Sequence, residues 1–222
     1  MGLFDNGMNT DAAISFQDNG RKLALYRYGA DPRDLPLLRG SRIEVEEDQY
    51  IAFIKGHELA DVWDKGSYQL TPDMFLMLEE KGAFPYQAGR PVDAELYFIN
   101  QMSIPDNPWG TVQPALIRED GQLYRVRAYG RFDFRIKDAI GFMLEGFLKR
   151  RLTYNYDIIQ YLKALVASSF TAVSSELAVP LTDVINHARD LSELVRRRAD
   201  AQAGLLGLEI PSVLVEGSSL AD

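Results

Sequence analysis

The chain has 222 residues and no cysteine, which excludes disulfides and thiolate metal sites. Its hydrophobic fraction of 46% and charged fraction of 25% are ordinary for a globular protein that buries a core. The formal net charge of −8 opposes binding to the phosphate backbone of nucleic acid, and no apolar run approaches the roughly 20 residues needed to cross a bilayer.

Residues 1–12 are polar and contain glycine, and we expect a flexible N-terminal arm. The start, MGLFDNGMNT, lacks the basic and apolar regions of a signal peptide, and Asn6 stands where myristoylation needs Ser or Thr. Leu3 and Phe4 have nothing local to bury them, so either the arm is disordered or these side chains insert into a membrane or a neighbouring subunit. We expect a cytoplasmic protein whose membrane contact is peripheral or through a partner.

The first half of the chain has a pattern of short strands and turns. Runs at 14–17 and 23–28 flank Asp18-Asn19-Gly20, which predicts a hairpin because Asn and Gly tolerate positive φ, and 30–36 is expected to be a loop. Four more strands are predicted at 42–45, 50–54, 58–63 and 67–71. The glycine turns at 55–57 and 64–66 are too short for crossover helices, so an antiparallel meander is expected.

The middle of the chain is less regular. Residues 73–81 are compatible with a short helix or an irregular connection, and both alternatives stay open. A strand is predicted at 92–100 and a turn at Asn107-Pro108-Trp109-Gly110.

The clearest segment is 124–136, where apolar residues and glycine alternate with charged residues and tyrosine over 13 positions. Period two predicts one long strand with a buried and a solvated face. Because so long a strand needs room to bend, we expect a bend or bulge at Gly130.

Helices are predicted in the last third, from the N-cap Asp138 to about Arg150, from 156 to 177, and from 181 or 182 to about Gly204, followed by a strand at 208–215. Strands first and helices later indicate an α+β fold rather than a parallel α/β sheet.

Catalytic and metal motifs are missing from the sequence. His57 lies in a predicted turn and His187 inside a predicted helix, and surface roles are favoured for both. Glu44 and the run 46–48 form a carboxylate cluster, interpreted as a solvated hairpin tip, with an acid–base pair of a hydrolase as the alternative. We expect no catalytic residues, no cofactor, no metal and no small-molecule substrate.

The solvated face of the predicted long strand carries four arginines, here called the arginine face: Arg125, Arg127, Arg131 and Arg135. Guanidinium groups bind phosphates in a bidentate way, so one hypothesis is that this face binds lipid headgroups or another anion. The favoured interpretation is cross-strand pairing with acids such as Asp93 and Glu95. The basic runs 149–151 and 196–198 are read as a helix C-terminus and a helix surface.

The ordered residues resemble the SPFH (Band 7) domain of stomatins, prohibitins and flotillins, and most closely the soluble bacterial branch labelled "virion core protein"-like. The resemblance rests on collinear segments: Met-Gly-Leu-Phe at the start, Gly40-Ser41-Arg42-Ile43, Ala60-Asp61-Val62, Gly66 to Thr71, Glu95 to Asn100, Trp109-Gly110-Thr111, Arg127 to Gly130, Phe134 to Asp138, and Gly207 to Ile210.

This resemblance implies a curved antiparallel sheet with helices on one side, self-association, membrane association and no catalytic residues. Stomatins and flotillins have an N-terminal membrane hairpin or lipid anchor, which is not expected here. Relatives of the branch often continue into a zinc ribbon, so the sequence ending at Asp222 is a short member or one domain of a longer protein.

Together these features predict one domain over 13–217 with a tail at 218–222. The favoured function is a non-enzymatic scaffold that self-associates and organises partner proteins at the cytoplasmic face of a membrane. The expected partners are further copies of the chain and membrane proteins or the membrane surface. The alternative is an anionic-lipid or peptide binding module that uses the arginine face.

Overall fold

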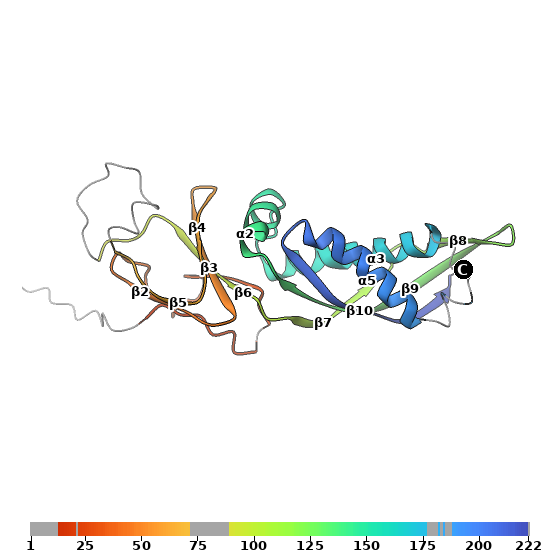
Figure 1. The fold of residues 1–222 in the computed structure, drawn as a ribbon, viewed down its shortest axis with the longest axis horizontal. Coiled ribbons are helices and arrows are strands. Elements are labelled where there is room, and N and C mark those ends of the chain that lie inside the picture. The colour runs from red at the N-terminus through yellow and green to blue at the C-terminus, as the bar shows by residue number, and fades with distance from the viewer. Residues whose placement is uncertain are drawn as a thin grey trace, which may run out of the picture. The chain divides into compact units, whose positions relative to one another are not determined.

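The computed structural model describes residues 13–20, 22–71, 89–176, 182, 184 and 188–221, so the predicted arm with Leu3 and Phe4, segment 73–81 and His187 lie outside the described residues. The chain divides into two compact units, described separately below (Figure 1). Unit 1 comprises Met1–Arg21 and Tyr26–Ile99, and unit 2 comprises Lys22–Leu25 and Asn100–Asp222. The predicted α+β class with antiparallel sheets is confirmed. The boundaries of a single domain at 13–217 stay a prediction.

The main sheet of the N-terminal half has the order β1-β6-β3-β4. Its strands are β1 (Leu25–Arg27), β6 (Glu95–Asn100), β3 (Gln49–Lys55) and β4 (Glu58–Trp63). The hairpin between β3 and β4 turns at Gly56 with φ of 64°, as the sequence predicts. Phe53 and Phe98 are almost fully buried and form part of its core.

The predicted meander is wrong in its pairing. Strand β2 (Arg42–Val45) pairs with β5 (Gly66–Gln69), and the β3–β4 hairpin is inserted between them in the chain. Turn signals indicate where a chain reverses, but the partner of each strand is decided by side-chain packing over longer distances. Likewise Asn19 and Gly20 have the predicted positive φ, yet Ile14 bridges to Ile43 and β1 pairs with β6, so the predicted hairpin does not form.

Unit 2 is built on a second sheet of the order β10-β9-β7, with β8 also paired to β9. Its strands are β7 (Ile104–Gly110), β8 (Ala115–Glu119), β9 (Gln122–Ile136) and β10 (Leu208–Leu220). The turn predicted at 107–110 is wrong, because these residues belong to β7. Among the described strands, β7 pairs with β9 alone, so it lies at an edge of the sheet, where Pro108 is tolerated.

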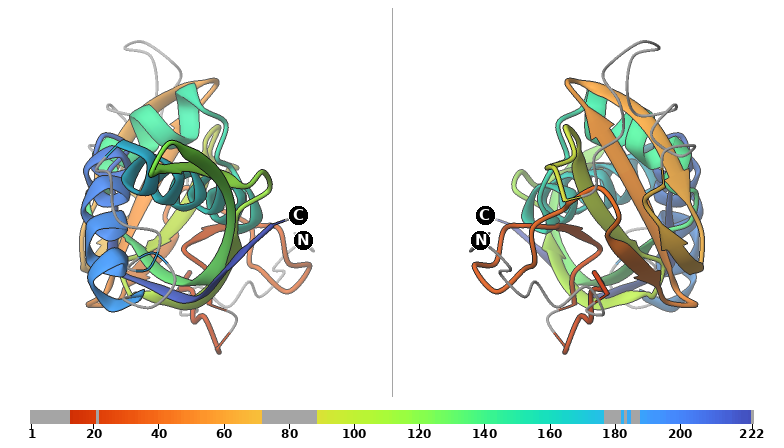
Figure 2. Two further views of the ribbon diagram at one scale, coloured as in Figure 1. Left: turned by 90° about the vertical axis from the view of Figure 1, so that its right-hand side faces the viewer. Right: turned by 90° about the vertical axis from the view of Figure 1, so that its left-hand side faces the viewer.

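Strand β9 confirms the predicted alternation, with buried side chains on one face and exposed ones on the other. It curves along its length (Figure 2). The predicted irregularity is present at Gly130, where the register with β10 shifts between Val215 and Gly217. A Cβ at Gly130 would lie 1.9 Å from the carbonyl oxygen of Leu214, so only glycine allows the two backbones to approach this closely.

Helices cover the buried face of this sheet (Figures 1 and 2). They are α2 (Ala139–Gly141), the π-helix η1 (Phe142–Lys149), α3 (Asn155–Glu176) and α5 (Ala188–Gly204). Asp138 is the predicted N-cap, since its carboxylate accepts from the Gly141 N–H at 3.0 Å. The predicted stripe of α3 is buried, including Ile158, Leu162 and Val166.

Side chains from the helices close the outer edges of the sheet. Asp200 of α5 accepts from the backbone N–H of Ile210 at 2.8 Å, and Ser192 accepts from that of Val215 at 2.9 Å. On the other side, Ser175 of α3 donates to the carbonyl of Leu116 in β8 at 2.8 Å. These bonds occupy backbone groups that would otherwise pair with a strand of another chain.

Candidate interaction surface

The arginine face lies where the sequence places it. Arg125, Arg127, Arg131 and Arg135 are all exposed on β9, and the intervening Val126, Ala128, Phe132 and Phe134 are buried. The helices occupy the opposite side of the sheet, so this side of β9 faces solvent (Figure 2). We call the exposed side of the unit 2 sheet the outer face.

Acids on β10 neutralise one half of the arginine face. Arg131 pairs with Glu216 at 3.0 Å, and Glu209 pairs with both Arg135 and Lys137. The hydrogen bond from Arg135 and, to a smaller extent, the one from Lys137 lower the pKa of the Glu209 carboxyl. Cross-strand pairing is thus confirmed for this half.

The partners named from the sequence, Asp93 and Glu95, are wrong. Glu95 pairs with Arg27 at 2.7 Å, and Asp93 is exposed, both within unit 1. Alternation along β9 shows which side chains share a face, but it does not tell which strand lies next to β9. The acids of β10 come more than 70 residues later in the chain, as the separations of 85 and 74 positions show.

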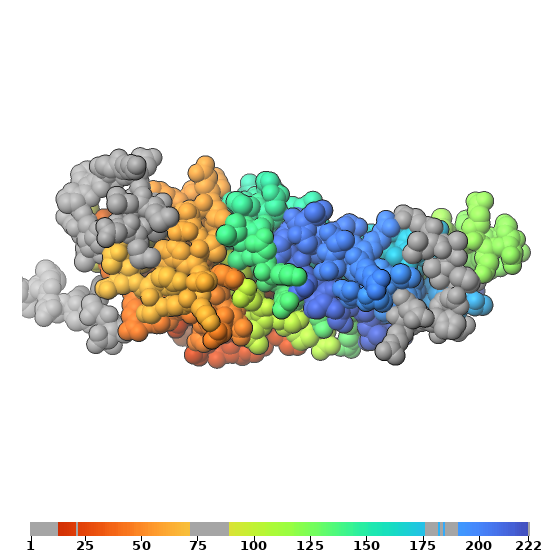
Figure 3. Space-filling view, viewed as in Figure 1, coloured from red at the N-terminus to blue at the C-terminus, as the bar shows by residue number. Residues whose placement is uncertain are grey.

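The other half of the outer face is formed by the β8–β9 hairpin. Leu116 lies opposite Arg125, Arg118 lies opposite Leu123, and Arg127 lies opposite Ser219 of β10. Residues directly opposite in an antiparallel pair share a face. None of the three arginines therefore has a carboxylate directly opposite it. In the space-filling view, the hairpin tip projects in light green (Figure 3).

Apolar side chains are exposed among these arginines. Leu116 is 49% exposed, Leu123 57% and Tyr129 59%. Tyr129 lies opposite Gly110 of β7 and Gly217 of β10, and a Cβ at Gly217 would lie 2.9 Å from its ring. The ring therefore rests on the backbone of β10 instead of inside the core. We define the hairpin patch as Leu116, Arg118, Leu123, Arg125, Arg127 and Tyr129.

Sequence reasoning missed Leu116, Arg118 and Leu123 because it predicted no strand at 115–119. A usable signal was present in Asp120-Gly121, a dipeptide typical of tight hairpins. Both residues have positive φ in the structure, at 48° and 78°. Alternate burial of Ala115 and Ile117 then assigns Leu116 and Arg118 to the outer face.

The acidic hairpin tip does not form the pocket that an acid–base pair requires. Glu46, Glu47 and Asp48 are exposed. Glu47 pairs with Lys65, and that hydrogen bond lowers the pKa of the Glu47 carboxyl. A general acid would need its pKa raised, so the hydrolase alternative is not supported at this tip.

The remaining predicted positions are on surfaces. His57 is exposed in its turn. Lys149 pairs with Glu145 near the end of η1, and the guanidinium of Arg150 lies 5.4 Å from the ring centre of Tyr161.

The basic run in α5 is also paired within its helix. Both Arg196 and Arg197 pair with Glu193, and their hydrogen bonds lower the pKa of the Glu193 carboxyl to about 2. Structural partners are thus present for Lys149 and Arg150 of the first run and for Arg196 and Arg197 of the second, in line with the interpretation of the runs as a helix end and a helix surface.

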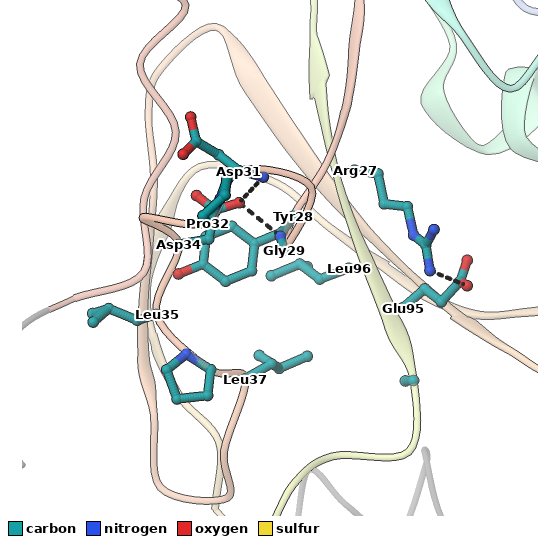
Figure 4. Close-up of a pocket in the computed structure, with 12 residues that line it drawn as sticks. Arg27, Tyr28, Gly29, Asp31, Pro32, Asp34, Leu35, Leu37, Glu95 and Leu96 are labelled. Atoms are coloured by element: carbon teal, nitrogen blue, oxygen red, sulfur yellow. Dashed lines mark hydrogen bonds and ion pairs between the residues drawn. The ribbon is translucent and has the colours of Figure 1, made fainter.

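Unit 1 contains an open cavity of about 410 Å³ beside the loop that follows β1 (Figure 4). Asp34 accepts hydrogen bonds there from the Tyr26 hydroxyl at 2.6 Å, from the Gly29 N–H at 2.7 Å and from the Asp31 N–H at 3.3 Å. Burial and, to a smaller extent, the hydrogen bond to Asp34 raise the pKa of the Tyr26 hydroxyl to about 12. These polar groups hold the loop in place.

Apolar walls complete the cavity, including Leu35, Leu37 and Leu96 (Figure 4). Arg27 and Glu95 line it as an ion pair at 2.7 Å, and Glu95 also accepts from the Tyr97 hydroxyl at 2.7 Å. The charged pair is therefore satisfied by the protein itself.

Within the described part of the chain, no helix is both long and apolar enough to span a membrane. No group of three or more His, Asp or Glu side chains is placed to hold a metal ion among the residues with described positions.

A family model described as "SPFH domain-Band 7 family" matches residues 25–222, which is most of the chain. No curated protein matches the sequence.

Proposed function

Because the chain belongs to the SPFH domain-Band 7 family, we propose that it is a non-enzymatic scaffold, assembled from several copies, that organises partner proteins at the cytoplasmic face of a membrane. The family supplies the general role, since its members act as membrane-associated scaffolds. The assembly from copies, the partners and the cellular location are our proposal. Placement in the "virion core protein"-like branch stays a prediction.

The outer face of the unit 2 sheet is the observation that carries this proposal. A sheet with one face buried under helices usually presents polar side chains on the other. Here Leu116, Tyr129 and Leu214 are each about half exposed on that other face. An exposed face that combines arginine with large apolar and aromatic side chains has the composition of a protein interface.

Closed sheet edges support a contact through this face. Ser192 and Asp200 occupy N–H groups of β10, and Ser175 occupies a carbonyl of β8. Strand addition is therefore disfavoured along these edges. Self-association through unit 2 is expected to use the outer face or the helices.

The test is the mass of the purified chain in solution, measured by light scattering over a wide concentration range. The proposal expects a mass that rises above that of the monomer as concentration increases. Cross-linking in cells, followed by identification of the captured proteins, is expected to recover copies of the chain together with membrane proteins. A monomer at every concentration, with no such captured proteins, contradicts the proposal.

A second candidate function is binding to anionic lipid, and the hairpin patch favours it. Arginine side chains bind phosphate, and the exposed Leu116 and Leu123 could enter the headgroup layer of a bilayer. Flotation with vesicles that contain phosphatidylserine tests this function at low salt. Absence of binding to these vesicles would exclude direct lipid recognition.

A further inference from the structure

The charge of this chain is divided unequally between its two units. Unit 1 contains 9 of the 24 Lys and Arg residues and 17 of the 32 Asp and Glu residues, which gives it a formal charge of −8. Unit 2 contains the other 15 residues of each kind and is formally neutral. The whole net charge of the protein therefore belongs to unit 1.

Within unit 2, positive charge is locally in excess at the hairpin patch. Arg118 and Arg127 take part in no ion pair within the part of the chain that the structure describes, and their opposite neighbours are Leu123 and Ser219. The remaining arginines of the outer face, Arg131 and Arg135, are neutralised by Glu216 and Glu209. Arg118 and Arg127 thus give the hairpin patch positive charge that no ion pair among the described residues neutralises.

Acidic side chains are available on unit 1. Glu46, Asp48, Glu58 and Asp93 are exposed, and none of the four is in an ion pair with another described residue. Charge complementarity therefore favours unit 1 as the surface that the hairpin patch binds, because arginine clasps carboxylates in a bidentate way. Every copy of the chain brings both surfaces at equal concentration.

We propose that the hairpin patch of one copy binds unit 1 of a second copy. This inference rests on the proposed self-association and names the surface that makes it. The contact joins two different surfaces, so it is heterologous, and each added copy leaves one patch and one unit 1 unoccupied. Assembly then continues by head-to-tail addition until a ring closes or other contacts stop it. Leu116, Leu123 and Tyr129 supply the apolar part of the contact.

Two charge-reversed variants test the pairing. The patch variant carries Arg118→Glu and Arg127→Glu. The unit 1 variant carries Glu46→Lys, Asp48→Lys, Glu58→Lys and Asp93→Lys, which brings that unit from a formal charge of −8 to zero. All six positions are exposed, so both variants are expected to fold, and circular dichroism with thermal unfolding checks this.

Each variant alone is expected to remain monomeric at concentrations where the wild type assembles, with a dissociation constant at least tenfold higher. An equimolar mixture is expected to regain assembly, because the intact patch of one variant meets the intact unit 1 of the other and the two reversed surfaces are also complementary in charge. The matched control, Arg118→Lys with Arg127→Lys, retains the charge but loses the bidentate geometry, so it is expected to assemble less tightly than the wild type and more tightly than the patch variant.

The outcomes separate this inference from the proposed function. A wild type that stays monomeric contradicts the proposed function itself. A patch variant that still assembles as the wild type does contradicts only the head-to-tail contact. An equimolar mixture of the two variants that stays monomeric also overturns it. If the patch variant keeps its assembly and loses binding to phosphatidylserine vesicles, the patch is a lipid surface and the inference is wrong.

Discussion

At the scale of single residues, glycine and hydrogen-bonded carboxylates shape this protein. Gly130 allows β9 and β10 to approach each other, and Gly217 makes room for the ring of Tyr129. Asp34 gathers three donors around one carboxylate oxygen, and Asp138 caps the first helix of unit 2. The close approach at Gly130 and the hydrogen bond from Tyr26 to Asp34 each lead to a measurable prediction.

Gly130→Ala is expected to destabilise the protein by at least about 1–3 kcal/mol, because the new Cβ would collide with backbone that cannot move independently of the sheet. The collision is with the carbonyl oxygen of Leu214 at 1.9 Å. Denaturant unfolding measures the free energy of unfolding.

The control for this prediction is Gly204→Ala at the end of α5. A Cβ there would meet nothing within 4 Å, and alanine favours helix, so a neutral or stabilising effect is expected. Equal losses of stability in the two variants would show that the close approach at Gly130 is unimportant.

Tyr26→Phe is expected to cost about 1 kcal/mol at neutral pH, since Asp34 loses a hydrogen bond of 2.6 Å. The pKa of Tyr26 is raised from 10.0 to about 12 in the folded protein. A raised folded-state pKa contributes stability that is complete below pH 10 and is lost as pH rises toward 12.

The difference in unfolding free energy between the wild type and Tyr26→Phe should therefore shrink across this alkaline window. Unfolding by denaturant at a series of pH values follows it. A difference that stays constant from pH 9 to pH 12 would contradict the role assigned to the Tyr26 hydroxyl.

At the scale of elements, the unit 2 sheet is completed by its helices. The helices bury one face of the sheet, and their polar side chains also bind its edges. Ser192 shows this most directly, because the hydrogen bond that it accepts from Val215 is buried. A buried N–H without a partner is costly, so the Val215 N–H depends on the Ser192 hydroxyl.

Ser192→Ala is expected to destabilise the protein by about 1–3 kcal/mol, the cost of leaving a buried N–H unpaired. Ser168→Ala is the matched control, since Ser168 only donates to the carbonyl of Leu165 in its own helix, and its loss is expected to be nearly neutral. Hydrogen exchange of the Val215 amide gives a second readout. Unchanged protection of this amide in Ser192→Ala would mean that the hydroxyl does not hold the edge.

At the scale of the whole molecule, the protein is acidic, yet it presents a basic and apolar surface. The two features are compatible because the net charge of −8 belongs to unit 1, while unit 2 is formally neutral. The proposed head-to-tail contact joins unlike surfaces of two copies, although the total charge of the copies repels them. Short-range attraction must therefore exceed the long-range repulsion.

Self-association is accordingly expected to depend on ionic strength. Raising the salt from about 0.1 M to about 1 M shortens the Debye length from about 10 Å to about 3 Å, which screens attraction between exposed charges. The dissociation constant of the wild type is expected to rise at least tenfold over this range, as measured by sedimentation equilibrium. Assembly that is strengthened by salt would indicate a purely apolar contact instead.

Local features of this protein could be predicted from the sequence alone. The alternation in β9 gave its two faces, and Asp138 and the stripe around Leu162 gave the helices, because each depends on residues close together in the chain. The arginine face was correct for the same reason. Gly130 could be identified as irregular because a long strand interrupted by glycine needs a bend.

Only the tertiary structure decided which segments meet. The pairing of β2 with β5, the assignment of 107–110 to β7 and the choice of Glu209 and Glu216 as arginine partners all join residues distant in the chain. Such contacts depend on which apolar faces pack against each other. The hydrophobic periodicity and the turn motifs of a sequence do not identify these distant partners. The hairpin patch belongs to this second class, since its excess of positive charge depends on which neighbours face Arg118 and Arg127 across the sheet.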